Sequence, residues 1–362
     1  MKKVDDFVSR LGIRHPIIQA PMVGVSTPAL AAAVSDAGAL GSLGIGAIGA
    51  TQAKKMIQQT RALTGRPFSV NMFCHPPAPR DPGVEAAWVR FIEPLFAEMG
   101  EACPTQLSEI YTSFLEQEDT FEVLCEQRPA AVSFHFGIPK REWIDGFRSR
   151  GIVTMATATN LYEAKLIEEA GIDMIVAQGS EAGGHRGMFD QFAVDELLST
   201  SVLVQLLARA TPLPVVAAGG IMDGRGIRAM LALGASAVQL GTAFVLCPES
   251  SANGNYRRNL KSERAMQTRL TSVISGRPAR GIVNRLIRHG EQLGAPPVPA
   301  YPVAYDVTKR LNAFEGRHEN HGEFAVQWAG QGATLARELP AADMVALLVE
   351  ELRREMRPPN AV

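Results

Sequence analysis

The chain has 362 residues, of which 46% are hydrophobic and 20% charged, so it can bury a large core and is not intrinsically disordered. Its formal net charge is −1 and it has no lysine or arginine block, which argues against nucleic acid or an anionic membrane as the main partner. No run approaches the roughly 18 apolar residues of a membrane-spanning helix, and the first ten residues do not resemble a secretory signal. The cysteines lie far apart without CxxC spacing, as is typical of reduced thiols in a cytoplasmic enzyme: Cys74, Cys103, Cys125 and Cys247.

Eight short apolar runs along the chain are typical of buried strands, and each precedes a glycine-rich or polar loop and then a helical pattern. The helix after the first run has Thr27 as a suitable N-cap and Pro28 at its first position. Repeated strand–helix units predict an α/β fold with a parallel sheet. Eight units favour a closed (β/α)8 TIM barrel, with an open doubly wound sheet as the alternative. The predicted strands are residues 15–20, 39–43, 67–73, 130–134, 152–156, 173–177, 213–218 and 235–240.

Two stretches interrupt this rhythm, namely residues 75–125 after the third strand and residues 246–330 after the eighth. Both leave from the carboxyl ends of strands, where barrel enzymes build their sites. We therefore predict that they form a second, smaller, mainly helical lobe that covers the barrel mouth. The barrel itself would consist of residues 1–74, 126–245 and 331–362, with a final amphipathic helix at about 335–357.

Glycine-rich loops follow three of the predicted strands. The loop at 177–187, Ala-Gln-Gly-Ser-Glu-Ala-Gly-Gly-His-Arg-Gly, surrounds His185 with glycines, which let backbone approach a ligand because no Cβ intervenes. Histidine is the side chain best suited to proton transfer near neutral pH. The loops at 217–226 and 238–244 follow strands seven and eight, where many barrels bind a phosphate through backbone amides. These loops predict an active site with a phosphate-binding end, built from Gly219, Gly220, Gly241 and Thr242.

A further glycine motif, Gly-Ile-Gly-Ala-Ile-Gly at 44–49, matches the GxGxxG pattern of dinucleotide-binding folds. Such folds also carry an acidic residue about 20 positions later, which binds the ribose. Residues 51–80 contain no aspartate or glutamate. We therefore interpret this motif as an ordinary glycine-rich loop between a strand and a helix.

Several of these segments resemble the nitronate monooxygenases, formerly called 2-nitropropane dioxygenases. They are 21–24 (Pro-Met-Val-Gly), 71–73 (Asn-Met-Phe), 177–187, 218–226 and 239–242. Residues 275–281 (Ser-Gly-Arg-Pro-Ala-Arg-Gly) and 328–332 (Trp-Ala-Gly-Gln-Gly) extend the resemblance over nearly the whole chain. Related FMN barrels, including NADH:quinone reductases and a flavin enoyl-reductase, share the first set, so these segments indicate the flavin better than the reaction.

The resemblance implies that FMN is bound at the barrel mouth. By position it implies flavin contacts from Met22, Gly24, Asn71, Gln178, Gly183, Gly184, Gly219, Gly220, Gln239, Leu240, Gly241 and Thr242. In class I members, tyrosines, two histidines and a lysine line the pocket over the flavin. The resemblance thus implies that His185 is catalytic and that the substrate is bound by Tyr111, His135, Tyr301, Tyr305 and Lys309. A helix starting near Pro302 would put the last three along one face, since they are spaced four apart.

The implied activity is the oxidation of an alkyl nitronate by FMN and O2 to a carbonyl compound and nitrite or nitrate, which is a detoxification reaction. A carboxylate-binding lysine and tyrosines suggest propionate 3-nitronate as the substrate. An NAD(P)H:quinone reductase on the same barrel is the main alternative, although no persuasive nicotinamide site is present. A lyase or isomerase acting on a sugar phosphate is a further alternative, but no spacing of His, Asp or Glu indicates a metal site.

We expect small molecules as the only partners, with no nucleic acid and no membrane, and a monomer or homodimer in the cytoplasm. The remaining histidines are expected to be polar groups of loops or of the surface: His15, His75, His289, His318 and His321.

Overall fold

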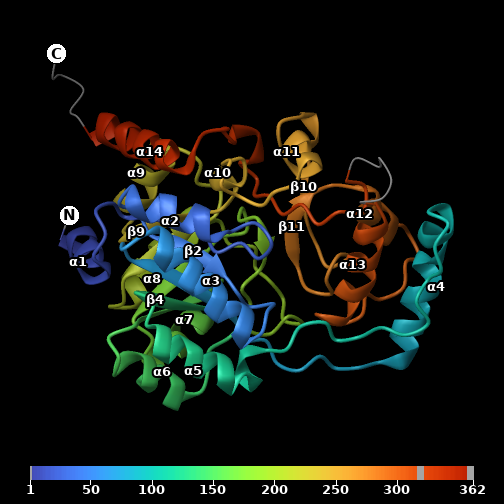
Figure 1. Cartoon of the computed structure of the whole chain (residues 1–362). Coiled ribbons are helices and arrows are strands. Elements are labelled where there is room, and N and C mark those ends of the chain that lie inside the picture. Colours follow the sequence, from blue (N-terminus) through green and yellow to red (C-terminus); the bar gives the residue numbers. More distant parts are fainter. Residues whose placement is uncertain (1, 316–321, 357–362) are drawn as a thin grey trace.

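The computed structural model describes residues 2–315 and 322–356. Within them, eight parallel strands form one sheet in the order β1-β9-β8-β6-β5-β4-β3-β2, which curves into a nearly closed barrel (Figure 1). Two backbone hydrogen bonds of 2.9 Å, from Gln19 to Leu40 and from Leu40 to Ile17, join β1 to the chain just before β2. The predicted TIM barrel is therefore confirmed. The strands are β1 (Ile17–Gln19), β2 (Gly41–Gly44), β3 (Phe68–Phe73), β4 (Ala131–His135), β5 (Val153–Ala158), β6 (Met174–Gln178), β8 (Val215–Ala218) and β9 (Ala237–Leu240).

Helices follow the strands and form the outer layer, as the sequence pattern predicted. The predicted cap is confirmed in the first of them, where the Thr27 side chain accepts a hydrogen bond from the Leu30 amide and Pro28 occupies the first position. A continuous apolar layer packs between these helices and the barrel wall. The outer helices are α2 (Pro28–Asp36), α3 (Ala50–Leu63), α5 (Glu118–Gln127), α6 (Arg141–Arg148), α7 (Leu161–Glu169), α8 (Thr200–Ala210), α9 (Gly224–Ala232) and α14 (Ala341–Met356).

The first helix, α1 (Lys2–Leu11), closes the amino end of the barrel. Its buried Phe7 and Leu11 belong to the same apolar cluster as Ala131, Val153 and Met174, which lie at the starts of three strands. Apolar side chains thus fill this end of the barrel interior, as expected when the inward-facing residues of short strands meet. The opposite end, where the strands finish, is the end at which barrel enzymes build their sites.

A second group of elements packs beside the carboxyl ends of the strands, on the right in Figure 1, with α4 on its outer side. It has its own apolar cluster, which includes Trp88, Phe96, Leu286 and Leu311. Its longer elements are α4 (Pro82–Glu98), α11 (Gly254–Leu260), β10 (Thr268–Thr271), β11 (Ala279–Ile282), α12 (Arg285–Gly290) and α13 (Val303–Glu315). A short helix, η2 (Glu263–Met266), follows α11. Two other short helices, α10 (Thr242–Val245) and η1 (Phe114–Glu116), pack into the apolar layer of the barrel, and η3 (Ala333–Leu335) precedes α14. The exact boundaries of this lobe remain a prediction.

A small antiparallel sheet joins this lobe to the barrel. Strands β10 and β11 pair with each other, and β11 also pairs with β7 (Gly184–His185) in the loop after β6, with Ala279 opposite His185. The sequence analysis did not predict these strands. Because β7 pairs with β11, backbone hydrogen bonds hold His185 between the barrel and the lobe. None of the helices in the described part of the chain is long and apolar enough to cross a membrane.

Candidate active site

A cavity of about 220 Å³ opens at the carboxyl ends of the strands, between the barrel loops and the second lobe. Every residue that the sequence analysis assigned to the cofactor or the substrate lines this one cavity. The barrel contributes Met22, Gly24, Asn71, His135, Gln178, Gly183, Gly184, His185, Gly219, Gly220, Gln239, Leu240, Gly241 and Thr242. The lobe contributes Tyr111, Tyr301, Tyr305 and Lys309. The structure therefore brings the residues together, while the role of each remains a prediction.

The charge of the cavity favours anions. No aspartate or glutamate occurs among the described residues that line it, and Lys309 is their one side chain with a permanent charge. The described residues also contain no group of three or more His, Cys, Asp or Glu side chains that could hold a metal ion. A ligand that carries a phosphate or another negative group is thus suited to this cavity, because no carboxylate repels it.

One end of the cavity is made of backbone. A Cβ on Gly183 would lie 2.6 Å from the nitrogen of Gly330, so residues 329–332 cross the mouth in direct contact with the loop after β6. Thr242 accepts a hydrogen bond of 3.0 Å from that same Gly330 nitrogen. In the neighbouring loop, Gly220 has a φ of +69°, which a glycine adopts without strain. Close backbone approach of this kind suits a ligand that is held by main-chain amides.

Two amide side chains at this end have different hydrogen-bonding states. Asn71 on β3 donates through Nδ2 to the backbone oxygen and to Oγ of Ser133, at 3.2 and 2.9 Å. Its oxygen takes part in neither bond and can accept from a ligand. Gln178 donates through Nε2 to the His185 backbone oxygen at 2.9 Å and accepts from the Gly187 amide at 2.8 Å. Both ends of the Gln178 amide therefore hold the loop that carries His185.

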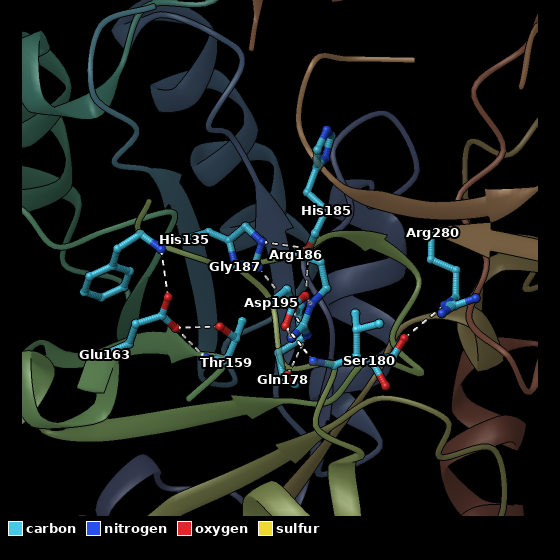
Figure 2. Close-up of polar contacts among 12 residues, drawn as sticks. His135, Thr159, Glu163, Gln178, Ser180, His185, Arg186, Gly187, Asp195 and Arg280 are labelled. Atoms are coloured by element: carbon cyan, nitrogen blue, oxygen red, sulfur yellow. Dashed lines mark hydrogen bonds and ion pairs between the residues drawn. The ribbon is translucent and has the colours of Figure 1, made fainter. Parts of the chain in front are cut away.

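A buried ion pair fixes the same loop from below, as Figure 2 shows. Arg186 is 1% exposed and donates two hydrogen bonds to Asp195, at 2.7 and 3.0 Å. A third bond, of 2.8 Å, runs from Arg186 to the backbone oxygen of Gln178. Because the guanidinium group fits a carboxylate with two parallel bonds, it holds the loop in one geometry. The His185 ring points away from this network (Figure 2).

The imidazole of His185 lies among aromatic rings. It makes edge-on contacts with Trp328 and Tyr301, with ring centroids 5.0 and 5.4 Å apart, and its Nε2 lies 2.9 Å from Oγ of Ser275. Burial lowers the pKa of His185 well below its usual value, and the nearby His135, Arg277 and His75 side chains lower it further. The ring is therefore neutral near pH 7.

His135, at the end of β4, uses both of its ring nitrogens within the protein. Nε2 lies 3.1 Å from the backbone oxygen of His185, and Nδ1 lies 2.9 Å from Oγ1 of Thr157. A carbonyl oxygen only accepts, so Nε2 carries the proton and Nδ1 accepts from the threonine hydroxyl. Burial lowers the pKa of His135 to about 4. This side chain thus supports the His185 backbone, and its polar atoms are not available to a substrate.

The lobe side of the cavity carries the predicted lysine and tyrosines. Helix α13 begins at Val303, as predicted, and places Lys309 with its ammonium nitrogen 5.3 Å from the Tyr305 ring centre and 5.6 Å from that of Tyr111. The Lys309 side chain is exposed at the rim. Tyr301 is buried and its hydroxyl has no hydrogen-bond partner, so it contributes its ring as a wall. Burial raises the pKa of both Tyr301 and Tyr305, so neither phenol ionises near neutral pH.

The sequence analysis missed several residues that surround the site. Trp328 and Tyr256 line the cavity, and Arg277 lies behind the Phe136 and Tyr301 rings. Trp328 and Arg277 lie in residues 328–332 and 275–281, which carry part of the family resemblance, so the sequence could have indicated both. Nothing in the sequence indicated Tyr256.

His75 lies in the loop after β3, as expected, but it is not a surface group. Its ring is 1% exposed and makes an edge-on contact with Tyr301 at 5.0 Å, and burial lowers its pKa to about 4. Its position between a strand and a proline-rich stretch gave no sign that the lobe would cover it. His15 and His289 are half-buried, and His318 and His321 lie outside the described residues.

Comparison with known proteins gives a consistent picture. A family model described as nitronate monooxygenase matches residues 6–351. A nitronate monooxygenase of Pseudomonas aeruginosa is 56% identical over 349 residues, covering 96% of this chain and 99% of that protein. Another from Paraburkholderia phytofirmans is 53% identical over 346 residues, covering 96% and 94%. Among solved structures, a nitroalkane oxidase from Streptomyces ansochromogenes matches with a TM-score of 0.86 at 38% identity, covering 96% of this chain and 98% of that one.

Proposed function

The chain belongs to the nitronate monooxygenase family of flavin-dependent oxidoreductases, and we propose that it uses FMN and dioxygen to oxidise propionate 3-nitronate. The products would be a carbonyl compound and nitrite or nitrate, and the reaction would remove a toxic nitronate. One observation carries the proposal. A single cavity without any carboxylate among its described lining residues joins the glycine loops of the barrel to His185 and Lys309.

The residues present fit FMN. Backbone at Gly219, Gly220 and Gly241 offers room and amide donors for a phosphate at the ends of β8 and β9, where barrels commonly bind one. The free oxygen of Asn71 can accept a hydrogen bond from the polar edge of the flavin ring. The chemistry that FMN supplies when bound is the transfer of electrons from the nitronate to dioxygen.

His185 and Lys309 would position the substrate. His185, which is neutral because burial lowers its pKa, would meet the nitro group as a hydrogen-bonding side chain. The ammonium group of Lys309 at the rim would bind the substrate carboxylate, with the rings of Tyr111 and Tyr305 on either side. Edge-on aromatic rings around His185 would exclude water from the reacting atoms.

Steady-state turnover tests this proposal. We expect the purified flavoprotein to consume oxygen and release nitrite when it is mixed with propionate 3-nitronate in air. An NAD(P)H:quinone reductase on the same scaffold would instead oxidise NADH with a quinone and show no oxygen uptake with the nitronate. That second pattern would contradict the proposed function.

A further inference from the structure

Arg277 is a buried guanidinium group with no carboxylate at ion-pair distance among the described residues. It is 1% exposed and donates to the backbone oxygens of Met188 and Phe189. Burial lowers the pKa of Arg277 to about 10, so the group remains charged at neutral pH. Arg186 is equally buried, but Asp195 neutralises it. The carboxylates of Glu163 and Asp190 act on Arg277 from beyond ion-pair distance, so its charge is balanced less directly than that of Arg186 and can act on the site that it adjoins.

Two aromatic rings connect Arg277 to His185. The guanidinium carbon lies 4.2 Å from the centre of the Phe136 ring, which contacts His185 edge-on with centroids 5.6 Å apart. Tyr301 likewise lies 6.0 Å from the guanidinium carbon and 5.4 Å from the His185 ring. The space between the two side chains is therefore packed with ring atoms and not with water. A positive charge acts strongly across such a medium, because little solvent screens it.

Ser275 provides a second connection, through hydrogen bonds. Its Oγ is fully buried, lies 2.9 Å from Nε2 of His185 and donates to the backbone oxygen of Arg277 at 3.2 Å. A hydroxyl has one proton, and a carbonyl oxygen can only accept. When the serine gives its proton to the Arg277 carbonyl, Nε2 of His185 donates to the serine. In the neutral ring the other nitrogen, Nδ1, is left unprotonated, and no described residue hydrogen-bonds to it.

We propose that Arg277 and Ser275 are positioning residues that keep His185 neutral and protonated on Nε2, so that it meets the anionic substrate without a second proton on its ring. The positive charge of Arg277 disfavours the addition of a second proton to the His185 ring. The hydrogen bond to Ser275 keeps the one proton of the neutral ring on Nε2. The inference rests on the proposed function only for the use that catalysis makes of His185. The charge state and tautomer themselves belong to the enzyme before substrate binds.

The other ionisable groups around His185 agree with this assignment. They are His135 at the end of β4, His75 after β3, Arg277 before β11, Tyr301 before α13, Tyr305 in α13, and Lys309 at the rim. None of them is a carboxylate, so none supplies a negative charge that would hold a second proton on the ring. Burial lowers the pKa of His185, and the charged Arg277 lowers it further.

Nuclear magnetic resonance of the flavin-loaded enzyme tests the inference directly. We would label histidine with ¹⁵N, identify the His185 signals by their loss in His185→Asn, and titrate from pH 8 to pH 5. The expected result for the unaltered enzyme is a neutral ring with its proton on Nε2 throughout. In Arg277→Met the titration midpoint of His185 should move upward, whereas in Arg277→Lys, which keeps the charge, it should stay close to the unaltered enzyme.

Two further variants control the experiment. Arg280→Met also removes a buried arginine, one that donates to the Ser180 backbone oxygen, and it should leave the His185 titration unchanged. Ser275→Ala should let the proton distribute between Nδ1 and Nε2, and this decides the tautomer claim even if Arg277→Met does not fold. The inference is overturned if His185 in the unaltered enzyme titrates near pH 6.5 or carries its proton on Nδ1. Failure of the enzyme to oxidise nitronates would overturn the proposed function. It would not change the expected charge state and tautomer of His185 in these spectra.

Discussion

His185 combines two properties that decide what it can do, because its ring is held at one nitrogen by Ser275 and is buried among aromatic side chains. Burial and nearby positive groups lower its pKa well below 6.5, so it is neutral in the physiological pH range. Under the proposed function, His185 would therefore meet a bound nitronate as a neutral hydrogen-bonding group and not as a cation.

Replacing His185 by Asn should lower turnover of propionate 3-nitronate by a factor on the order of 10²–10⁴, the range over which positioned acid–base groups contribute. Flavin content should stay the same, because His185 is not among the residues expected to hold the cofactor. The measurements are kcat and the visible absorbance per protein. His15→Asn, at the opposite end of the barrel, serves as the control and should keep full activity. Unchanged turnover in His185→Asn would remove this residue from the mechanism.

Lys309 should contribute only to the binding of the substrate carboxylate. In Lys309→Met we expect KM for propionate 3-nitronate to rise roughly three- to tenfold, since the lysine is exposed at the rim and water weakens its attraction for a carboxylate. KM for ethyl nitronate, which has no carboxylate, should not change. An equal rise in KM for both substrates would show that Lys309 does not bind the substrate carboxylate.

At the level of elements, the site depends on residues 329–332 crossing the mouth of the barrel against the loop after β6. In Gly183→Ala, the new Cβ would lie 2.6 Å from the Gly330 nitrogen and 2.7 Å from the Ala329 carbonyl carbon, so backbone must move. We expect a weaker affinity for FMN and a lower Tm, measured by flavin titration and thermal unfolding. The matched variant Gly65→Ala places its Cβ in open space and should change neither. If Gly183→Ala bound flavin like the unaltered enzyme, this contact would not shape the cofactor site.

The sequence predicted the barrel because each of its strands is a short apolar run with a glycine or polar loop behind it. The cavity residues were also predictable, since the carboxyl ends of parallel strands converge on one face. Strands β7, β10 and β11 were not, because they are short and because β11 pairs with β7, which lies far from it in the sequence. The burial of His75 escaped prediction for the same reason, as it depends on a lobe that distant segments build.

The hydrogen-bond partners within the site could not be predicted from the sequence. Gln178 and His135 were expected to contact ligands, but Gln178 forms hydrogen bonds with the backbone of His185 and Gly187. His135 forms hydrogen bonds with the His185 backbone and the Thr157 hydroxyl. Which atom a side chain turns toward its neighbour depends on the final packing and not on local pattern. The sequence therefore placed these residues around the cavity, whereas the hydrogen bonds that each of them makes could not be predicted.

For the whole molecule, buried histidines couple stability to pH. Burial lowers the pKa of His75 from 6.5 to about 4, so the folded state binds its proton more weakly than the unfolded chain does. The stability that comes from keeping this ring neutral is present above pH 6.5 and is lost as the pH falls from 6.5 to about 4. For one such group the loss amounts to about 3 kcal/mol.

We expect Tm to fall over that pH interval and to fall less steeply in His75→Phe. The phenyl ring can keep the edge-on contact with Tyr301 and has no proton to bind. Thermal unfolding at a series of pH values provides the test. Identical pH profiles for the two proteins would mean that His75 does not link acid to unfolding.

The central claim is that a bound flavin takes electrons from a nitronate in this cavity. Its most direct test is to mix the purified enzyme with propionate 3-nitronate in the absence of oxygen and to record the visible flavin absorption. We predict that the absorption band decreases on mixing and returns when air is admitted. A spectrum that does not change with the nitronate but is bleached by NADH would contradict the account and favour a quinone reductase.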